Sequence, residues 1–135
     1  MKYWSSVRTD YDSILSSSDK ETARTDYAGK ANTDIIAASD ISEAAYCCVN
    51  YEFPNGQKGY LPSAGEWTIV QKNRTAITNA MAAIGGTAFV NDYYWSSTQH
   101  GSPAAAWEFK PLLPSGGMEY VDKHAKNLVR PFTTL

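Results

Sequence analysis

The spacing of apolar residues predicts one long helix in the middle of the chain. Ser63 and Glu66 form an S-x-x-E capping box, a motif that begins many helices. The apolar positions that follow, at spacings of three, seven, four and three residues, are Trp67, Val70, Ile77, Met81 and Ile84. These spacings place them on one helical face, so we expect a helix over 64–83 whose apolar stripe packs in the core. Gly85-Gly86 marks its end.

Two shorter helices are expected before this one, separated by a break near Ser39-Asp40. Thr33 can cap the first helix and Ser42 can cap the second. Their apolar positions are Ile35, Ile36, Ala44, Ala45, Cys47 and Cys48. Residues 1–31 are polar and rich in Ser, Thr and Asp, so we expect a short strand at 3–7 and loop elsewhere.

After the paired glycines the apolar pattern changes to alternation, which is typical of strands. In the first strand one face holds Tyr93, Trp95 and Ser97, and the other holds Tyr94, Ser96 and Thr98. Further strands are expected at 107–109, 118–122 and 128–130. Helices followed by an antiparallel sheet predict an α+β fold.

Length and composition describe one globular domain, 1–135, with a loop-rich part (1–31), a helical part (32–86) and a strand and loop part (87–135). Aromatic residues make up 13%, as is typical of a sheet-rich protein. The formal charge is −2 and the 12 Lys and Arg are scattered, so no nucleic-acid partner is expected. No apolar run has the length of a membrane span, and none follows Met1 as in a signal peptide, so no membrane insertion is expected.

The sequence offers little for catalysis or metal binding. Cys47 and Cys48 are adjacent, and neighbouring residues rarely reach disulfide geometry. We expect both to be small buried side chains on a helix, since a redox or metal pair would need C-x-x-C spacing and a second ligand cluster. His100 and His124 have no second His or paired carboxylate at ligand spacing. No catalytic residue, metal or cofactor is therefore expected.

Four short motifs carry a family resemblance: GYLPSAGEW at 59–67, YYWSST at 93–98, AWEF at 106–109 and VRPF at 129–132. Their order and spacing resemble the C-type lectin-like bacterial domains, which are related to the formylglycine-generating-enzyme fold. That group includes the major paralogous surface domains and the variable proteins of diversity-generating retroelements. The resemblance implies two or three helices packed on a short-stranded antiparallel sheet. The sequence lacks the Glu-Pro-Asn and Trp-Asn-Asp signatures of calcium-dependent sugar binding.

Retroelement members of this family carry a C-terminal tract in which adenines of Asn codons are rewritten. Such codons never yield Trp, Glu, Lys, Gln or Met. The stretches 100–106 and 111–117 contain none of these types, whereas Trp107, Glu108 and Lys110 lie between them. This pattern favours two replaceable islands, although an ordinary loop rich in Gly, Ser and Pro would have the same composition.

The resemblance implies a ligand-binding surface on these late loops and strands. Its expected residues are His100, Gly101, Ser102, Pro103, Ala104, Ala105, Pro111, Leu112, Leu113, Pro114, Ser115, Tyr120, Asp122, His124, Ala125 and Asn127. The residues from Tyr120 to Asn127 either form a recognition surface or an ordinary solvated strand face. Leu112 and Leu113 either form an exposed apolar patch or fold under the sheet.

The function implied is a non-enzymatic display domain that recognises a protein or glycan on a target cell surface. It would sit on a phage tail fibre or on a bacterial surface protein. One alternative is an enzyme related to the formylglycine-generating branch, which would need separated reactive cysteines late in the fold. The other is a structural spacer with no ligand of its own. The sequence does not indicate an oligomeric state.

Overall fold

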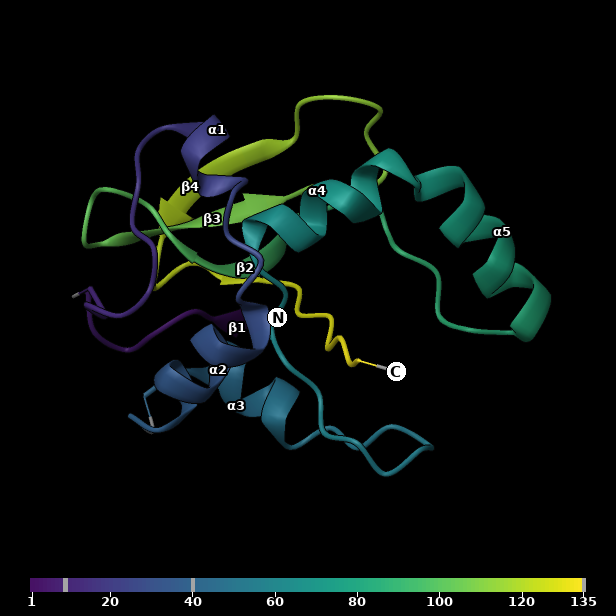
Figure 1. Ribbon diagram of the computed structural model, residues 1–135, viewed down its shortest axis with the longest axis horizontal. Helices are drawn as coiled ribbons and strands as arrows, with labels where there is room; N and C mark the ends of the chain where they lie inside the picture. Colours follow the sequence, from purple (N-terminus) through teal and green to yellow (C-terminus); the bar gives the residue numbers. More distant parts are fainter. Residues whose placement is uncertain (9, 40, 135) are drawn as a thin grey trace.

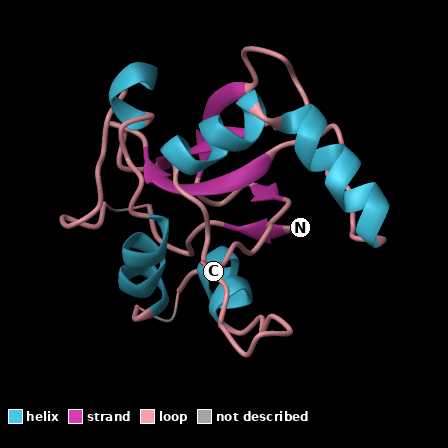
Figure 2. Cartoon of the chain, turned by 45° about the vertical axis from the view of Figure 1, so that its right-hand side comes forward, coloured by secondary structure: helices cyan, strands magenta, loops and turns pink. Residues whose placement is uncertain are grey.

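Two layers of helices enclose a small antiparallel sheet, which makes this an α+β protein. The computed structural model describes residues 1–8, 10–39 and 41–134. In chain order its elements are β1 (Lys2–Tyr3), α1 (Lys20–Ala23), α2 (Gly29–Ala37), α3 (Glu43–Val49), α4 (Ala64–Lys72), α5 (Arg74–Ile84), β2 (Tyr94–Gln99), β3 (Ala105–Phe109), β4 (Met118–Asp122) and β5 (Lys126–Asn127). Helices α1 and α4 lie on one side of the three-stranded sheet, and α2 and α3 lie on the other (Figures 1 and 2).

The three-stranded sheet has the order β2-β3-β4, and its strands β2 and β3 are buried on both faces. Trp95 and Ala106 belong to one apolar cluster, with Ile36 of α2 and Ala45 of α3. The opposite cluster comprises Ala23, Ala64, Trp67, Val70, Tyr94, Trp107, Phe109 and Met118. Every residue of β2 and β3 is buried, because helices cover both faces. The predicted alternation is therefore correct, but it separates two cores instead of a core and a solvated face.

The N-terminal segment is part of the core. Strand β1 pairs with β5 in a second, two-stranded sheet, with Lys2 opposite Asn127. The indole of Trp4 is fully buried and donates a hydrogen bond to the carbonyl of Ser96, at 2.8 Å. In return, the indole of Trp95 donates to the carbonyl of Lys2, at 2.8 Å. The first residues of the chain are thus bound to strands about ninety positions later.

Two helix starts agree with their predicted caps. Ser63 accepts from the backbone of Glu66, whose carboxylate accepts in turn from the backbone of Ser63. The same carboxylate accepts from the backbone N–H of Gly29, at 3.0 Å, which ties α4 to the start of α2. Ser42 caps α3 through the backbone N–H of Ala45. Both caps are formed by hydrogen bonds between residues three apart in the sequence, so the local sequence is enough to predict them.

The single helix predicted over 64–83 is wrong. The chain forms two helices, because Asn73 leaves helical geometry (φ −109°, ψ 18°) and its amide donates to the carbonyl of Ile69. The predicted apolar stripe is divided accordingly. Trp67 and Val70 are buried in the core, whereas α5 has no buried residue and its Ile84 is 81% exposed.

Three other boundaries differ from prediction. Helix α2 begins four residues earlier than the expected cap Thr33, whose hydroxyl instead donates to the carbonyl of Gly29. Helix α1, capped by Asp19, lies within the part expected to be loop. The last strand is β5, just before the predicted 128–130. The predicted break at 39–40 falls partly on residue 40, which lies outside the described residues.

Candidate functional site

The turn between β2 and β3 presents exposed backbone on fixed ends. Gly101, Ser102 and Pro103 are exposed, while His100 and Ala105 at the two ends are buried. The backbone N–H of His100 donates to the carbonyl of Ala105, at 3.1 Å. The backbone N–H of Ser102 donates to Nδ1 of His100, at 3.0 Å. The turn is thus held by its own hydrogen bonds, and its tip faces solvent.

Next to this turn, three aromatic rings form a stack. The ring of Tyr120 lies parallel to that of His100, with centroids 3.9 Å apart and 20° between the planes. Trp107 packs edge-on against both rings, at 4.9 Å from His100 and 5.8 Å from Tyr120. The indole of Trp107 also donates to the carbonyl of Ser17, at 3.0 Å. Tyr120 is 55% exposed, so an immobilised phenol remains accessible to a ligand.

A polar cluster continues the same surface beyond Tyr120. The two carboxylate oxygens of Asp122 lie 3.0 and 2.8 Å from Nε of Arg8. The backbone N–H of His124 donates to this carboxylate, and that bond together with Arg8 holds the pKa of Asp122 below its ordinary value. Nε2 of His124 lies 2.8 Å from the carbonyl of Ser6. The N-terminal residues 6–8 therefore border the predicted surface, a contribution that no sequence pattern indicated.

The structure separates the predicted residues into two groups. We call the first group the hairpin-end surface: Gly101, Ser102, Pro103, Tyr120, Asp122 and His124. The second group, 111–115, lies in the β3–β4 connection. Because β3 runs antiparallel to both neighbours, its two connections leave from opposite ends of the sheet (Figure 1). The predicted single surface is thus two surfaces.

The β3–β4 connection packs against the helices. Pro111 is buried, Leu112 and Leu113 are half-buried, and Pro114 and Ser115 are exposed. The amide of Gln71 in α4 donates to the carbonyl of Gly116, at 2.7 Å. Leu112 lines a hollow shared with α5 residues, among them Thr78. Neither expected arrangement of the leucines is observed: both are half-buried, and Leu112 lies beside α5 and not under the sheet.

Several predicted ligand-binding positions are not surface positions. His100, Ala105, Pro111 and Asn127 are buried, and Ala104 and Ala125 are half-buried. The amide of Asn127 donates to the carboxylate of Glu108, at 2.8 Å, and burial raises the pKa of that carboxyl. These side chains pack or form bonds inside the protein, because helices and the N-terminal segment cover the strands that carry them.

Gly101 is exposed but closely approached. A Cβ at this position would lie 2.2 Å from Oγ and 3.0 Å from the backbone nitrogen of Ser18. Free replacement is therefore limited to its exposed neighbours Ser102 and Pro103. The composition of the tract gave no sign of this contact, since Ser18 belongs to a distant segment.

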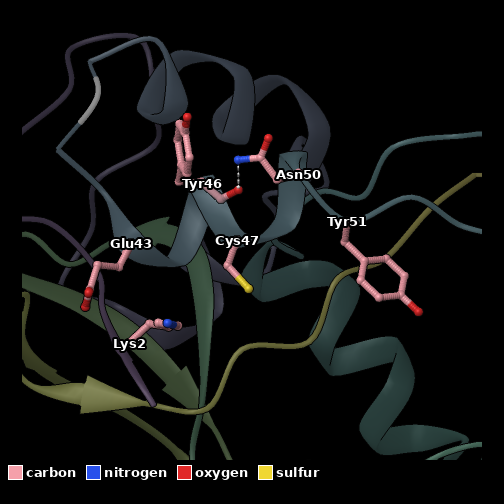
Figure 3. A pocket seen from close by; sticks show the side chains of 6 residues that line it. All are labelled: Lys2, Glu43, Tyr46, Cys47, Asn50 and Tyr51. Carbon is pink, nitrogen blue, oxygen red and sulfur yellow. Dashed lines mark hydrogen bonds between the residues drawn. The ribbon is translucent and has the colours of Figure 1, made fainter.

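The cysteines differ from expectation in one respect. Cys48 is buried as predicted, but Cys47 is exposed. Burial raises the pKa of the Cys48 thiol, chiefly through desolvation, so this group is no ready thiolate. Cys47 faces a surface hollow of about 470 Å³ whose other lining residues are Lys2, Glu43, Tyr46, Asn50 and Tyr51 (Figure 3).

Two polar side chains of this hollow have partners within the chain. The carboxylate of Glu43 accepts from the backbone N–H of Tyr3, at 3.0 Å. The amide of Asn50 donates to the carbonyl of Tyr46, at 2.9 Å. Across residues 1–8, 10–39 and 41–134, no three His, Cys, Asp or Glu side chains are grouped so that they could hold a metal ion.

Comparisons with known proteins do not assign the chain to a family. No family model, curated protein or solved structure matches it. In the part of the chain that the structure describes, no helix has the length and apolar character needed to cross a bilayer.

Proposed function

We propose that this chain is a non-enzymatic ligand-binding domain of the C-type lectin-like kind, with the hairpin-end surface as its recognition site. The observation that carries the proposal is the exposed Tyr120, held against the buried His100 and Trp107 beside an open turn. A fixed aromatic ring contributes contact area with little loss of conformational entropy on binding. Protein–ligand surfaces commonly use such rings as their strongest contacts.

The surroundings of Tyr120 suit a polar ligand. The ring of Tyr120 stacks on His100, which bonds the exposed turn through Ser102, and two residues further along β4 Asp122 bonds Arg8 and the backbone of His124. Such a mixture of one apolar ring and several hydrogen-bonding groups fits a protein epitope or a glycan on a cell surface. We place the domain on a phage tail fibre or a bacterial surface protein, as the resemblance implies.

The proposal includes diversification of the tip by a retroelement. The exposed or half-exposed positions at this end of the sheet are Ser102 and Pro103, together with Tyr120, Asp122 and His124. Deep sequencing of the gene in one bacterial population should therefore find amino-acid variation concentrated at these positions. Uniform codons there would contradict the retroelement part of the proposal, while ligand binding would stay open to direct measurement.

Direct binding tests the recognition site itself. We would label the full chain with a fluorophore and measure its binding to an immobilised glycan panel and to intact bacterial cells. Tyr120→Ala should lower binding by at least about tenfold, since exposed aromatic contacts of this kind are commonly hot spots. Tyr27→Ala is the matched control, because Tyr27 is 61% exposed and lies outside the surface. Equal loss in both variants, or a wild-type chain that binds neither panel, would contradict the proposal.

A further inference from the structure

One exposed segment of the chain is free of charge. Residues 75–91, here called the arm, contain no Asp, Glu, Lys, Arg or His, although 19% of the whole chain is charged. The arm comprises most of α5 and the extended return to β2, and nearly all of it is exposed. Helix α5 projects from the body of the molecule (Figures 1 and 2). Depletion of charged residues from exposed surface is a property of protein–protein interfaces.

The arm is anchored at its base. Phe89 packs against Trp67 and Tyr94, with ring centroids 5.6 and 5.5 Å apart. The guanidinium of Arg130 donates to the carbonyl of Thr87, at 2.6 Å, and lies over the ring of Phe89. The return segment is therefore fixed to the core, and α5 is held in one position relative to the sheet.

Helix α5 itself has little to stabilise it within one chain. It is 11 residues long and none of them is buried. Isolated helices of this length are marginal in water, and most helices in proteins depend on packing of an apolar face. Ile77 packs against the core, whereas further along α5 Met81 is half-buried and Ile84 is 81% exposed. A second surface covering α5 would supply the missing burial.

An apolar groove lies beside the tip of the arm. Its volume is about 640 Å³, and it is lined by Tyr51, Phe53, Pro54, Met81, Ile84, Gly85, Gly86, Thr87, Val129, Arg130 and Pro131. Among these described residues Arg130 alone is charged, and its guanidinium is engaged by Thr87 and Phe89. Tyr51, in the wall of this groove, is 50% exposed.

We propose that the arm and this groove form the interface between two copies of the chain. Each molecule carries the groove and, directly beside it, the tip of α5, which could enter the groove of another copy. A two-fold axis between them therefore lets each copy place its Ile84 against the groove of the other, which is an isologous contact. Together the arm and the groove offer on the order of twenty residues a side, the size of a standard interface.

Charge favours a second copy over other partners. An uncharged surface provides no opposite charge to attract a nucleic acid or a charged peptide. A second copy of the chain carries the same uncharged patch, so the two patches can meet without burying a charge. The net charge of −2 adds little repulsion between copies. The hairpin-end surface lies at the opposite end of the long axis from α5 (Figure 1). A dimer would thus present two recognition sites, and paired sites raise the avidity for a repetitive cell surface.

Sedimentation velocity of the full chain over a concentration series tests this proposal. The wild type should form a dimer whose fraction rises with concentration, and Ile84→Glu should weaken association by at least about tenfold, because the interface would then bury a charge. Ile69→Glu is the matched control: Ile69 is 50% exposed on α4 and lines none of the groove. It should leave the dimer intact.

Other outcomes would overturn the proposal. A wild type that stays monomeric up to roughly 0.1 mM has no interface of useful strength. Equal association of wild type and Ile84→Glu, or equal loss in Ile69→Glu, would place the contact elsewhere. If Ile84→Glu does not fold by circular dichroism, Ala80→Glu replaces it, since Ala80 is exposed on the same helix.

Discussion

The backbone N–H of Ser102 donates to Nδ1 of His100, and this bond defines the protonation state of the ring. A nitrogen that accepts a hydrogen bond carries no proton, so the imidazole is neutral with its proton on Nε2. Burial lowers the pKa of His100 below its ordinary value of 6.5, which agrees with that assignment. The observed shape of the exposed turn therefore depends on an uncharged His100.

Acidification should loosen this turn. The folded state binds a proton at His100 less readily than the unfolded state does, so the stability it contributes is present above pH 6.5 and is lost as pH falls below it. Protonation of Nδ1 breaks the Ser102 bond, which is worth about 1 kcal/mol, and this cost is part of the same proton linkage. Urea unfolding at about pH 7.5 and about pH 5 should show a smaller acid loss in His100→Gln than in wild type. His124→Gln is the control, because His124 is exposed, and an unchanged acid loss in His100→Gln would contradict the assignment.

The turn should tolerate change at its tip and resist it at Gly101. Replacing Ser102, Pro103 and Ala104 together by Asn, Ser and Ser should alter the free energy of unfolding by no more than about 0.5 kcal/mol, since Ser102 and Pro103 are exposed and the change at the half-buried Ala104 is small. Gly101→Ala should destabilise by about 1–3 kcal/mol, because its Cβ would meet Ser18. Denaturant unfolding compares the two. A collapse of the triple variant would remove the idea of an interchangeable tip.

Two adjacent glycines allow conformational strain and steric contact to be separated. Gly116 and Gly117 both have positive φ, 72° and 70°. A Cβ at Gly116 has open space, whereas one at Gly117 would lie 2.9 Å from Leu113 and 3.1 Å from Cβ of Lys110. Gly116→Ala should cost about 1 kcal/mol of stability, and Gly117→Ala should cost about 1–2 kcal/mol more. Thermal unfolding ranks the stabilities of the two variants. Equal losses of stability would contradict the steric contact at Gly117.

A buried carboxylate joins the helices to the sheet. Oδ2 of Asp26 accepts from Thr98 of β2 and from the amide of Asn32, both at 2.8 Å, and Oδ1 accepts from the backbone of Ala28. Asp26→Ala removes the acceptor of the buried Thr98 hydroxyl and one of the two acceptors of the buried Asn32 amide, so we expect a loss of about 3 kcal/mol in urea unfolding. The control is Asp34→Ala, whose exposed carboxylate lies 3.4 Å from Lys30 and should matter by less than about 0.5 kcal/mol. Similar losses in the two variants would show that Asp26 does not connect the layers.

Some predictions from sequence failed because they concern contacts between distant segments. The apolar period continues unbroken from Trp67 to Ile84, yet the chain turns at Asn73 and only the first part meets the sheet. His100 and Asn127 have the polarity of surface residues, but a tyrosine stacks on the first and Glu108 bonds the second. A periodic pattern states which side chains share a face, and it does not state what that face meets.

The sequence by itself determined the features that depend on neighbours in the chain: the caps at Ser42 and Ser63, the end of α5 at Gly85, the alternation of the strands and the α+β order of elements. Only the tertiary structure decided the burial of β2 and β3 on both faces, the separation of the predicted surface into two, and the role of Trp4 and Arg8. The physical reason is range. Caps, turns and periodicity act over a few residues, whereas burial and recognition surfaces arise where segments separated by ninety residues or more come into contact.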